Sequence, residues 1–252
     1  MMSDFLSIKE LFYSYPSGEV ALRGINLQIS CGETVGVVGG NGAGKTTLLM
    51  HLNGCLLAAS GTVSVGGLLV SKQNLKEIRN QVGLLFKDPD DQLFMPTVEE
   101  DVAFGLLNMG LSADVVEQRV VQALDSVDAL HLRKKSPVRL SAGEKRRAAL
   151  AAVLSMKPSV LVLDEPTDGL DPYARRKLIN VLQGVDHTLV IASHDLDFVA
   201  ATCRRVLLLN NGCLMSDSSP EQLFINYQLL AECHLEPPLS LQSCAVCTPH
   251  KY

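Results

Sequence analysis

The 252-residue chain is 47% apolar and carries a formal net charge of -5. This length suits one large domain or two small ones, and the apolar content is enough for a sizeable core. The acidic balance disfavours a dedicated nucleic-acid-binding protein, because such proteins present a basic patch.

The composition also bears on location. No apolar stretch reaches the roughly 18–20 residues that span a bilayer, and the opening residues 1–4 (MMSD) lack the basic-then-apolar pattern of a signal peptide. We therefore expect a chain without a membrane anchor of its own, in the cytoplasm. The seven cysteines are scattered along the chain, which indicates free thiols.

Short apolar runs separated by turn residues predict strands in the first part of the chain. The first two predicted strands are antiparallel in character and flank the turn at 16–18. A helix is expected after residue 46 and another, short one, follows later. The expected strands are 5–15, 21–29, 34–38, 62–65, 68–70 and 82–86, and the expected helices are 47–52 and 75–79.

The second part of the chain alternates helical patterns with continuous apolar runs. The runs 159–163 and 188–192 are typical of central strands in a parallel sheet buried on both faces. Thr97 and Glu100 form a capping-box pattern that predicts a helix start. A further strand (205–209) leads into a hairpin turn (210–212). Helices are expected after Thr97 and near 113–127, 141–156, 172–182 and 220–231. The pattern predicts an α/β fold with a mainly parallel core sheet, an N-terminal antiparallel β part and a helical subdomain at about 90–157.

Residues 39–46 (GGNGAGKT) match the phosphate-loop pattern G-x-x-x-x-G-K-[ST] and lie between a predicted strand and a predicted helix. Backbone N–H groups of such a loop point at phosphate oxygens, and the helix N-terminus adds a positive dipole end. We expect Lys45 to reach the β- and γ-phosphates of a nucleotide and the Thr46 hydroxyl to ligate Mg²⁺. The residues expected to hold the nucleotide are Gly39, Gly40, Asn41, Gly42, Ala43, Gly44, Lys45, Thr46 and Thr47.

Two strand ends add acid–base groups to this loop. Asp164 and Glu165 follow a predicted buried strand, where Asp164 would hold Mg²⁺ and Glu165 would act as general base on water. His194 follows another parallel strand and is expected at the same sheet edge, close to the γ-phosphate. Tyr15 ends a strand, where it would either stack on a purine ring or simply pack.

Together these residues resemble an ATP-binding cassette (ABC) ATPase over about residues 5–235. Residues 140–144 (LSAGE) resemble the family's signature L-S-G-G-Q, and residues 168–171 resemble its D-loop. The resemblance implies that Tyr15 stacks on adenine, that His194 is the switch histidine, and that Ser141 and Gly143 contact the nucleotide of a second subunit. The expected ATPase domain covers residues 3–235, followed by a tail (236–252).

Within the family, residues 88–94 (DPDDQLF) and 97–105 (TVEEDVAFG) resemble the ATPases of energy-coupling-factor and cobalt/nickel importers. The resemblance implies a phosphate-loop NTPase that binds ATP with Mg²⁺ and hydrolyses it. It also implies a head-to-tail dimer with a second ABC ATPase subunit, identical or different, at the cytoplasmic face of the cell membrane. The partner would be an integral membrane transporter subunit, and the cargo a small solute such as a metal ion or a vitamin.

Three positions depart from the family pattern. Lys87 stands where the family usually has a Gln that contacts Mg²⁺ or water, and Ala142 and Glu144 replace a Gly and a Gln of the signature. Glu144 would bring negative charge close to a bound phosphate unless a capping box with Ser141 turns it back to the helix start. We expect slow but real hydrolysis.

Other functions fit parts of the pattern. A hydrolysis-impaired partner subunit is supported by Lys87 alone, and a soluble cassette on DNA or ribosomes conflicts with the acidic charge. A small-molecule kinase shares the phosphate loop but lacks the signature. Cys244, Cys247 and His250 have zinc-like spacing but supply three ligands where a structural site wants four, so we interpret them as a chance cluster.

Overall fold

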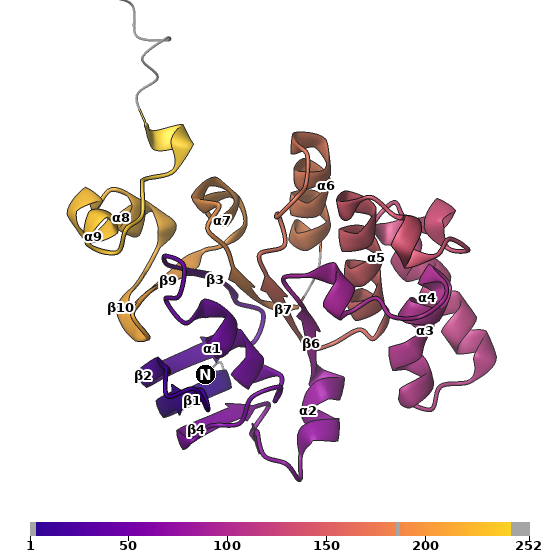
Figure 1. Ribbon diagram of the computed structural model, residues 1–252, viewed down its shortest axis with the longest axis horizontal. Helices are drawn as coiled ribbons and strands as arrows, with labels where there is room; N and C mark the ends of the chain where they lie inside the picture. The colour runs from indigo at the N-terminus through magenta and orange to yellow at the C-terminus, as the bar shows by residue number, and fades with distance from the viewer. Residues whose placement is uncertain (1–3, 185–186, 243–252) are drawn as a thin grey trace, which may run out of the picture.

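A six-stranded sheet forms the middle of the molecule in the computed structural model, which describes residues 4–184 and 187–242 (Figure 1). Its strand order is β10-β9-β3-β8-β7-β6, and all neighbours are parallel except the edge hairpin β9–β10. The strands are β3 (Thr34–Val38), β6 (Val82–Leu85), β7 (Val160–Asp164), β8 (Thr188–Ala192), β9 (Arg205–Asn210) and β10 (Cys213–Ser218).

Burial explains why these apolar runs become central strands. Every residue of β7 and of β8 is buried, so both faces of the sheet are covered and the runs need no polar alternation. The prediction of a mainly parallel core sheet is confirmed.

A second, antiparallel sheet has the order β2-β1-β4-β5. One hydrophobic cluster joins the two sheets, because Leu48 and Leu52 of α1 lie in it together with residues of β1 and β3. The phosphate loop and α1 are therefore held between the sheets (Figure 1). The elements are β1 (Asp4–Ser14), β2 (Val20–Ser30), α1 (Lys45–Leu52), β4 (Ser60–Val65) and β5 (Leu68–Leu69).

Helices α3, α4 and α5 pack against one another at the right of Figure 1. Capping boxes begin two of them, as the sequence predicts: the Thr97 N–H donates to Glu100 Oε2 (3.0 Å) before α3, and Ser141 pairs with Glu144 before α5. The remaining helices are α2 (Leu75–Gln81), α3 (Val98–Asn108), α4 (Ala113–Ser126), α5 (Ala142–Ser155), α6 (Pro172–Gln183), α7 (Leu196–Thr202), α8 (Pro220–Phe224) and α9 (Tyr227–Glu232).

Two helical features differ from the sequence predictions. The single helix expected near 220–231 is wrong: Asn226 interrupts it and caps α9 by accepting from the Leu229 N–H (3.1 Å). Helix α7 was not expected, although Asp195 gives an N-cap signal and accepts from the Phe198 N–H (2.8 Å). Within the described residues, no helix is long and apolar enough to span a membrane.

Five cysteines lie in the described part of the chain, and all are free thiols, as the sequence indicates. The tail residues Cys244, Cys247 and His250 lie outside the described residues.

Candidate active site

The phosphate loop, residues 39–46, connects β3 to α1 and is packed from two sides by backbone. A Cβ on Gly39 would stand 2.3 Å from the carbonyl oxygen of Leu209, and one on Gly44 (φ 103°) would stand 2.7 Å from that of Ala21. Neither position has room for a side chain. The backbone of the loop is thus packed against β9 and β2, while Asn41 and Gly42 are exposed to solvent.

Lys45 folds back over the loop. Its side chain is buried, and Nζ donates to the carbonyl oxygens of Gly39 (2.7 Å) and Gly40 (3.1 Å). Burial lowers the pKa of Lys45, while the nearby carboxylates of Glu165 and Asp164 oppose this shift. The ammonium group therefore lies inside the loop, beside the two acidic residues that the sequence predicts for the site.

Thr46 and Asp164 meet across the sheet edge, where Thr46 Oγ1 donates to Asp164 Oδ2 (2.7 Å). The other oxygen of Asp164, Oδ1, is buried without a hydrogen-bond partner in the described part of the chain. Burial raises the pKa of Asp164, and the Thr46 bond opposes this shift. A hydroxyl and a carboxylate with a spare oxygen are the ligands that Mg²⁺ prefers, so these residues fit a magnesium ion.

Glu165 is held at the end of β7 in a left-handed conformation (φ 46°), which is unusual for a residue with a side chain. Its backbone N–H donates to the Ala192 carbonyl (2.9 Å), which ties it to β8. Its buried carboxylate accepts from the His194 N–H (3.0 Å), and ring Nδ1 of His194 lies 2.8 Å from the same oxygen, Oε2. Ligand atoms of Glu165, His194 and Asp168 lie within 4.8 Å of one another.

A cavity of about 160 Å³ adjoins the loop and is lined by Tyr15, Lys87, Glu165 and residues 41–47. The Tyr15 hydroxyl is hydrogen-bonded to Thr47 Oγ1 (2.9 Å), and its ring stands edge-on to Tyr13 at 5.2 Å. Glu19 also lines this cavity. Glu19 was not predicted, because it lies directly before β2 and belongs to no recognisable motif.

Ser141 and Gly143 do not line this cavity. They lie at the start of α5, beside the D-loop, where a Cβ on Gly143 would stand 3.7 Å from Leu170 Cδ2 and one on Gly169 would stand 3.7 Å from Ala142 Cβ. The chain therefore brings together the loop, Asp164, Glu165 and His194, and keeps the signature segment apart from them.

Two of the departures from the family pattern are accommodated within α5. Glu144 turns back to the helix start, where Oε2 accepts from the Ser141 N–H (2.8 Å) and hydroxyl (2.9 Å). The backbone hydrogen bond to Ser141 holds the pKa of Glu144 below its usual value, with help from the Ser141 hydroxyl. Ala142 begins the helix, and its φ is not positive, so it needs no glycine.

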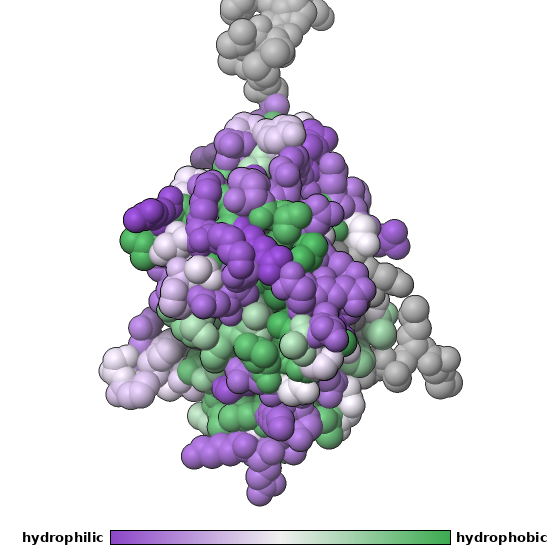
Figure 2. Space-filling view, turned by 90° about the vertical axis from the view of Figure 1, so that its right-hand side faces the viewer, coloured by the Kyte–Doolittle hydropathy of each residue, from purple (hydrophilic) through white to green (hydrophobic). Residues whose placement is uncertain are grey.

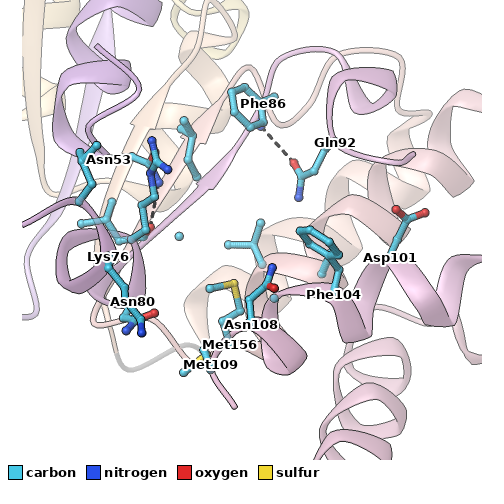
Figure 3. Close-up of a pocket in the computed structure, with 18 of the residues that line it drawn as sticks. Asn53, Lys76, Asn80, Phe86, Gln92, Asp101, Phe104, Asn108, Met109 and Met156 are labelled. Atoms are coloured by element: carbon cyan, nitrogen blue, oxygen red, sulfur yellow. Dashed lines mark hydrogen bonds between the residues drawn. The ribbon is translucent and has the colours of Figure 1, made fainter. Parts of the chain in front are cut away.

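A larger hollow of about 730 Å³ lies between α2 and β6 on one side and α3 and α5 on the other. We call it the groove; Figure 3 shows Phe86, Gln92, Phe104 and Met156 among its lining. Phe94 and Phe104 pack edge-to-face (5.0 Å) although both are exposed. Figure 2, which views the molecule from the right of Figure 1, shows apolar side chains gathered between polar ones on that side of the molecule.

A phosphate loop whose threonine meets a strand-end aspartate, next to a buried glutamate and a histidine, is typical of a nucleotide-hydrolysing site, and the separate signature segment indicates the class. The chain belongs to the ABC transporter family: the model described as ABC transporter matches residues 22–168. It is an ATP-binding ABC ATPase with that family's fold.

Comparison with known proteins refines this placement. The chain is 53% identical, over 98% of its length and 99% of the relative's, to a Geobacter sulfurreducens protein named "Putative ABC transporter ATP-binding protein". It is 45% identical, over 92% of its length and 76% of the relative's, to the energy-coupling factor transporter ATP-binding protein EcfA of Methanothermobacter thermautotrophicus. The structure of CbiO1 from Clostridium perfringens, part of an ABC transporter complex, has a TM-score of 0.79 and 37% identity, and the match covers 91% of this chain and 94% of CbiO1.

Proposed function

We propose that this ATPase powers the import of a small solute through an integral membrane partner, from the cytoplasmic face of the membrane. Residues 3–235 form the proposed ATPase domain, with about 90–157 as its helical subdomain and 236–252 as the tail. Support comes from the relatives named EcfA and CbiO1 and from the groove beside the nucleotide site. A metal ion such as cobalt or nickel, or a vitamin, is the proposed cargo.

The geometry supports a catalytic role for each of these residues. Phosphate oxygens of ATP take the place of the Gly39 and Gly40 carbonyls as partners of Lys45. Thr46 and Asp164 would hold Mg²⁺, which when bound would supply charge stabilisation for the transferring phosphoryl group. Glu165 takes a proton from the attacking water, and His194 fixes the Glu165 carboxylate and presents its exposed ring to the γ-phosphate.

The separation of Ser141 and Gly143 from their own cavity supports a head-to-tail dimer. In such a dimer, each nucleotide lies between the phosphate loop of one subunit and the first N–H groups of α5 of the other. Those N–H groups have no intrahelical partners and attract an anion. The second subunit is either a second copy of this chain or a different ABC ATPase.

The groove is the proposed docking site for the membrane partner. Phe94 (61% exposed) and Phe104 (39% exposed) form an aromatic pair at its edge, and solvent-exposed aromatic pairs are typical anchors of interfaces. Lys72, Lys76 and Arg79 on the α2 side would give the docking segment polar contacts at the rim.

In the experiment, the tagged chain is expressed in its native host, and the membranes are extracted with a mild detergent. We expect an integral membrane protein to co-purify with it, and the double variant Phe94→Ala/Phe104→Ala to lose at least tenfold of that protein. Val138→Ala is the matched control, because Val138 is 87% exposed but does not line the groove. Equal co-purification by the groove variant and the control would contradict this docking site.

A hydrolysis-impaired partner role is the second candidate, because Lys87 lines the cavity that also contains Glu165. An ammonium there opposes Mg²⁺ and neutralises the general base. Phosphate release from Mg-ATP by the purified chain separates the two roles: measurable turnover that disappears in Glu165→Gln supports the first, and no turnover by the unmodified chain supports the second.

A further inference from the structure

Arg146 is a buried cation on α5 that touches two other segments of the site. Its side chain lies on the helix that begins at the signature, and the residue is only 5% exposed. Nη1 donates to the Phe86 carbonyl (3.1 Å), and Nη2 lies 3.5 Å from the Asp168 carbonyl in the D-loop. One guanidinium therefore connects α5 to the end of β6 and to the D-loop.

The other backbone group of Phe86 is also tied to α5. The Phe86 N–H donates to Gln92 Oε1 (3.3 Å), as the dashed line in Figure 3 shows, and Gln92 Nε2 donates to the Ala149 carbonyl (2.8 Å). Arg146 and Ala149 are three residues apart and lie on the same side of α5. We call Arg146, Gln92 and the Phe86 peptide groups the clamp.

The clamp lies between the groove and the nucleotide site. Phe86 and Gln92 both line the groove, whereas Lys87, the next residue after Phe86, lines the cavity beside the phosphate loop. A displacement of Phe86 would move α5 with it, because its carbonyl is bonded to Arg146 and its N–H is linked through Gln92 to Ala149 on the same helix. The start of α5 is Ser141, which the proposed dimer places on the second nucleotide.

Burying a cation without a carboxylate in direct contact is costly. Burial lowers the pKa of Arg146, while the charges of Asp168, Asp88, Asp164 and Glu165 favour its charged form. An apolar residue at this position would avoid the burial cost but would bond neither carbonyl. The planar fork of a guanidinium reaches two carbonyls at once, which a lysine ammonium on a flexible stem does not do equally well.

We propose that Arg146 and Gln92 are positioning residues that couple the groove and the D-loop to the signature end of α5. The inference rests on the proposed dimeric ATPase. None of the hydrogen bonds of the clamp goes to the phosphate loop or to Asp164, so its loss should leave nucleotide binding by one subunit intact and misplace Ser141 and Gly143 against the nucleotide of the other.

The test compares Arg146→Lys and Gln92→Glu with the control Arg147→Lys, which changes the next residue of the same helix. For each full-length variant, three quantities are measured: the affinity for a fluorescent ATP analogue without Mg²⁺, kcat for Mg-ATP, and the protein concentration that gives half-maximal hydrolysis. We expect both clamp variants to keep nucleotide affinity within about twofold. Their kcat falls at least tenfold and their half-maximal concentration rises, whereas Arg147→Lys changes each quantity by less than about threefold.

Amide hydrogen exchange supplies a readout independent of activity. In Arg146→Lys we expect faster exchange in residues 86–92 with unchanged protection in β7, because the clamp is local to the end of β6. Clamp variants that hydrolyse like the unmodified chain, or that lose nucleotide affinity in step with kcat, would overturn the inference. If the unmodified chain forms no ATP-dependent dimer, either with itself or with the second ABC ATPase that co-purifies with it, the proposed function and this inference are overturned together. A dimerising chain with unaffected clamp variants overturns this inference alone.

Discussion

One carboxylate oxygen of Glu165, Oε2, contacts His194 twice: it accepts a hydrogen bond from the backbone N–H and lies 2.8 Å from ring Nδ1. A carboxylate only accepts hydrogen bonds, so the ring proton sits on Nδ1 and Nε2 is left to face outward. Nε2 lies 3.8 Å from Asp168 Oδ1. The proposed general base, Glu165, is thus oriented by His194, the residue that is proposed to contact the γ-phosphate.

Replacing Glu165 by Gln removes the proton acceptor but keeps the hydrogen-bonding shape. We expect kcat for Mg-ATP to fall by about 10²–10⁴-fold, which is the usual contribution of a general base. Phosphate release measures this. Binding of a fluorescent ATP analogue should stay within a few-fold of the unmodified chain; a Glu165→Gln protein that still turns over ATP would show that another group is the base.

Asp164→Asn should stabilise the protein at neutral pH while abolishing Mg-dependent hydrolysis. Burial raises the pKa of Asp164 in the folded state above its unfolded value of about 3.9. Protonated Asp164 therefore contributes to the free energy of unfolding below that unfolded value. This contribution is lost as the pH rises through the folded pKa, because the buried carboxyl group then ionises. At pH 7, the thermal unfolding temperature of Asp164→Asn should be higher than that of the unmodified chain by about 2–4 °C, as expected for a gain of roughly 1 kcal/mol in the free energy of unfolding of a chain of this size.

That gain has a pH signature of its own. The difference in unfolding temperature between Asp164→Asn and the unmodified chain should shrink as the pH is lowered toward 4, where Asp164 becomes protonated in both the folded and the unfolded chain. Asp91→Asn is the control, because Asp91 is exposed. A lower unfolding temperature for Asp164→Asn at pH 7 would contradict this prediction. It would indicate that the attraction between ionised Asp164 and Lys45 outweighs the cost of burying the Asp164 charge.

Glu144→Gln and Lys87→Gln should differ in effect. Gln reaches back to Ser141 as Glu144 does, so we expect the hydrolysis rate to change by less than about threefold. Lys87 lies in the nucleotide cavity, and Lys87→Gln removes a cation from the vicinity of Mg²⁺, so the rate should rise. Steady-state phosphate release from Mg-ATP measures the rate of each variant. Unchanged rates in both variants would show that Glu144 and Lys87 do not influence hydrolysis.

Gly143→Ala should separate folding from dimer chemistry. Its Cβ would make an ordinary 3.7 Å contact with Leu170, so the unfolding temperature should be unchanged or slightly higher. Hydrolysis should fall at least tenfold, because the added methyl group meets the phosphate of the second subunit. Gly169→Ala is the contrast: at φ 72° a side chain is strained, and its unfolding temperature should fall. Normal hydrolysis by Gly143→Ala would contradict the proposal that the start of α5 binds the nucleotide of the second subunit.

Much of the site was predictable because its residues follow local rules. The phosphate loop needs only one strand, one turn and one helix, and the strand-end acids Asp164 and Glu165 follow buried apolar runs that are visible in the sequence. Parallel strands then bring their carboxyl ends to one edge. The structure places Thr46 against Asp164, as this reasoning expects.

The parts that escaped prediction depend on contacts between distant segments. The bond between Arg146 and Phe86 joins two segments far apart in the sequence, and no periodicity reports it. An arginine in an alanine-rich helix suggests an exposed residue, yet Arg146 is buried. The break at Asn226 was missed because the apolar residues on both sides continue a helical period, and only the Asn226 cap shows that the chain turns.

The packing of Gly39 against Leu209 and of Gly44 against Ala21 has a consequence for folding. The phosphate loop acquires its observed packing only when a segment that precedes it, at Ala21, and one far along the chain, at Leu209, have docked on it. The Gly212 N–H completes the arrangement by donating to the Ala43 carbonyl (3.0 Å). Such long-range closure is slow, so ATP binding should appear late in refolding, and bound ATP should protect the whole chain against unfolding.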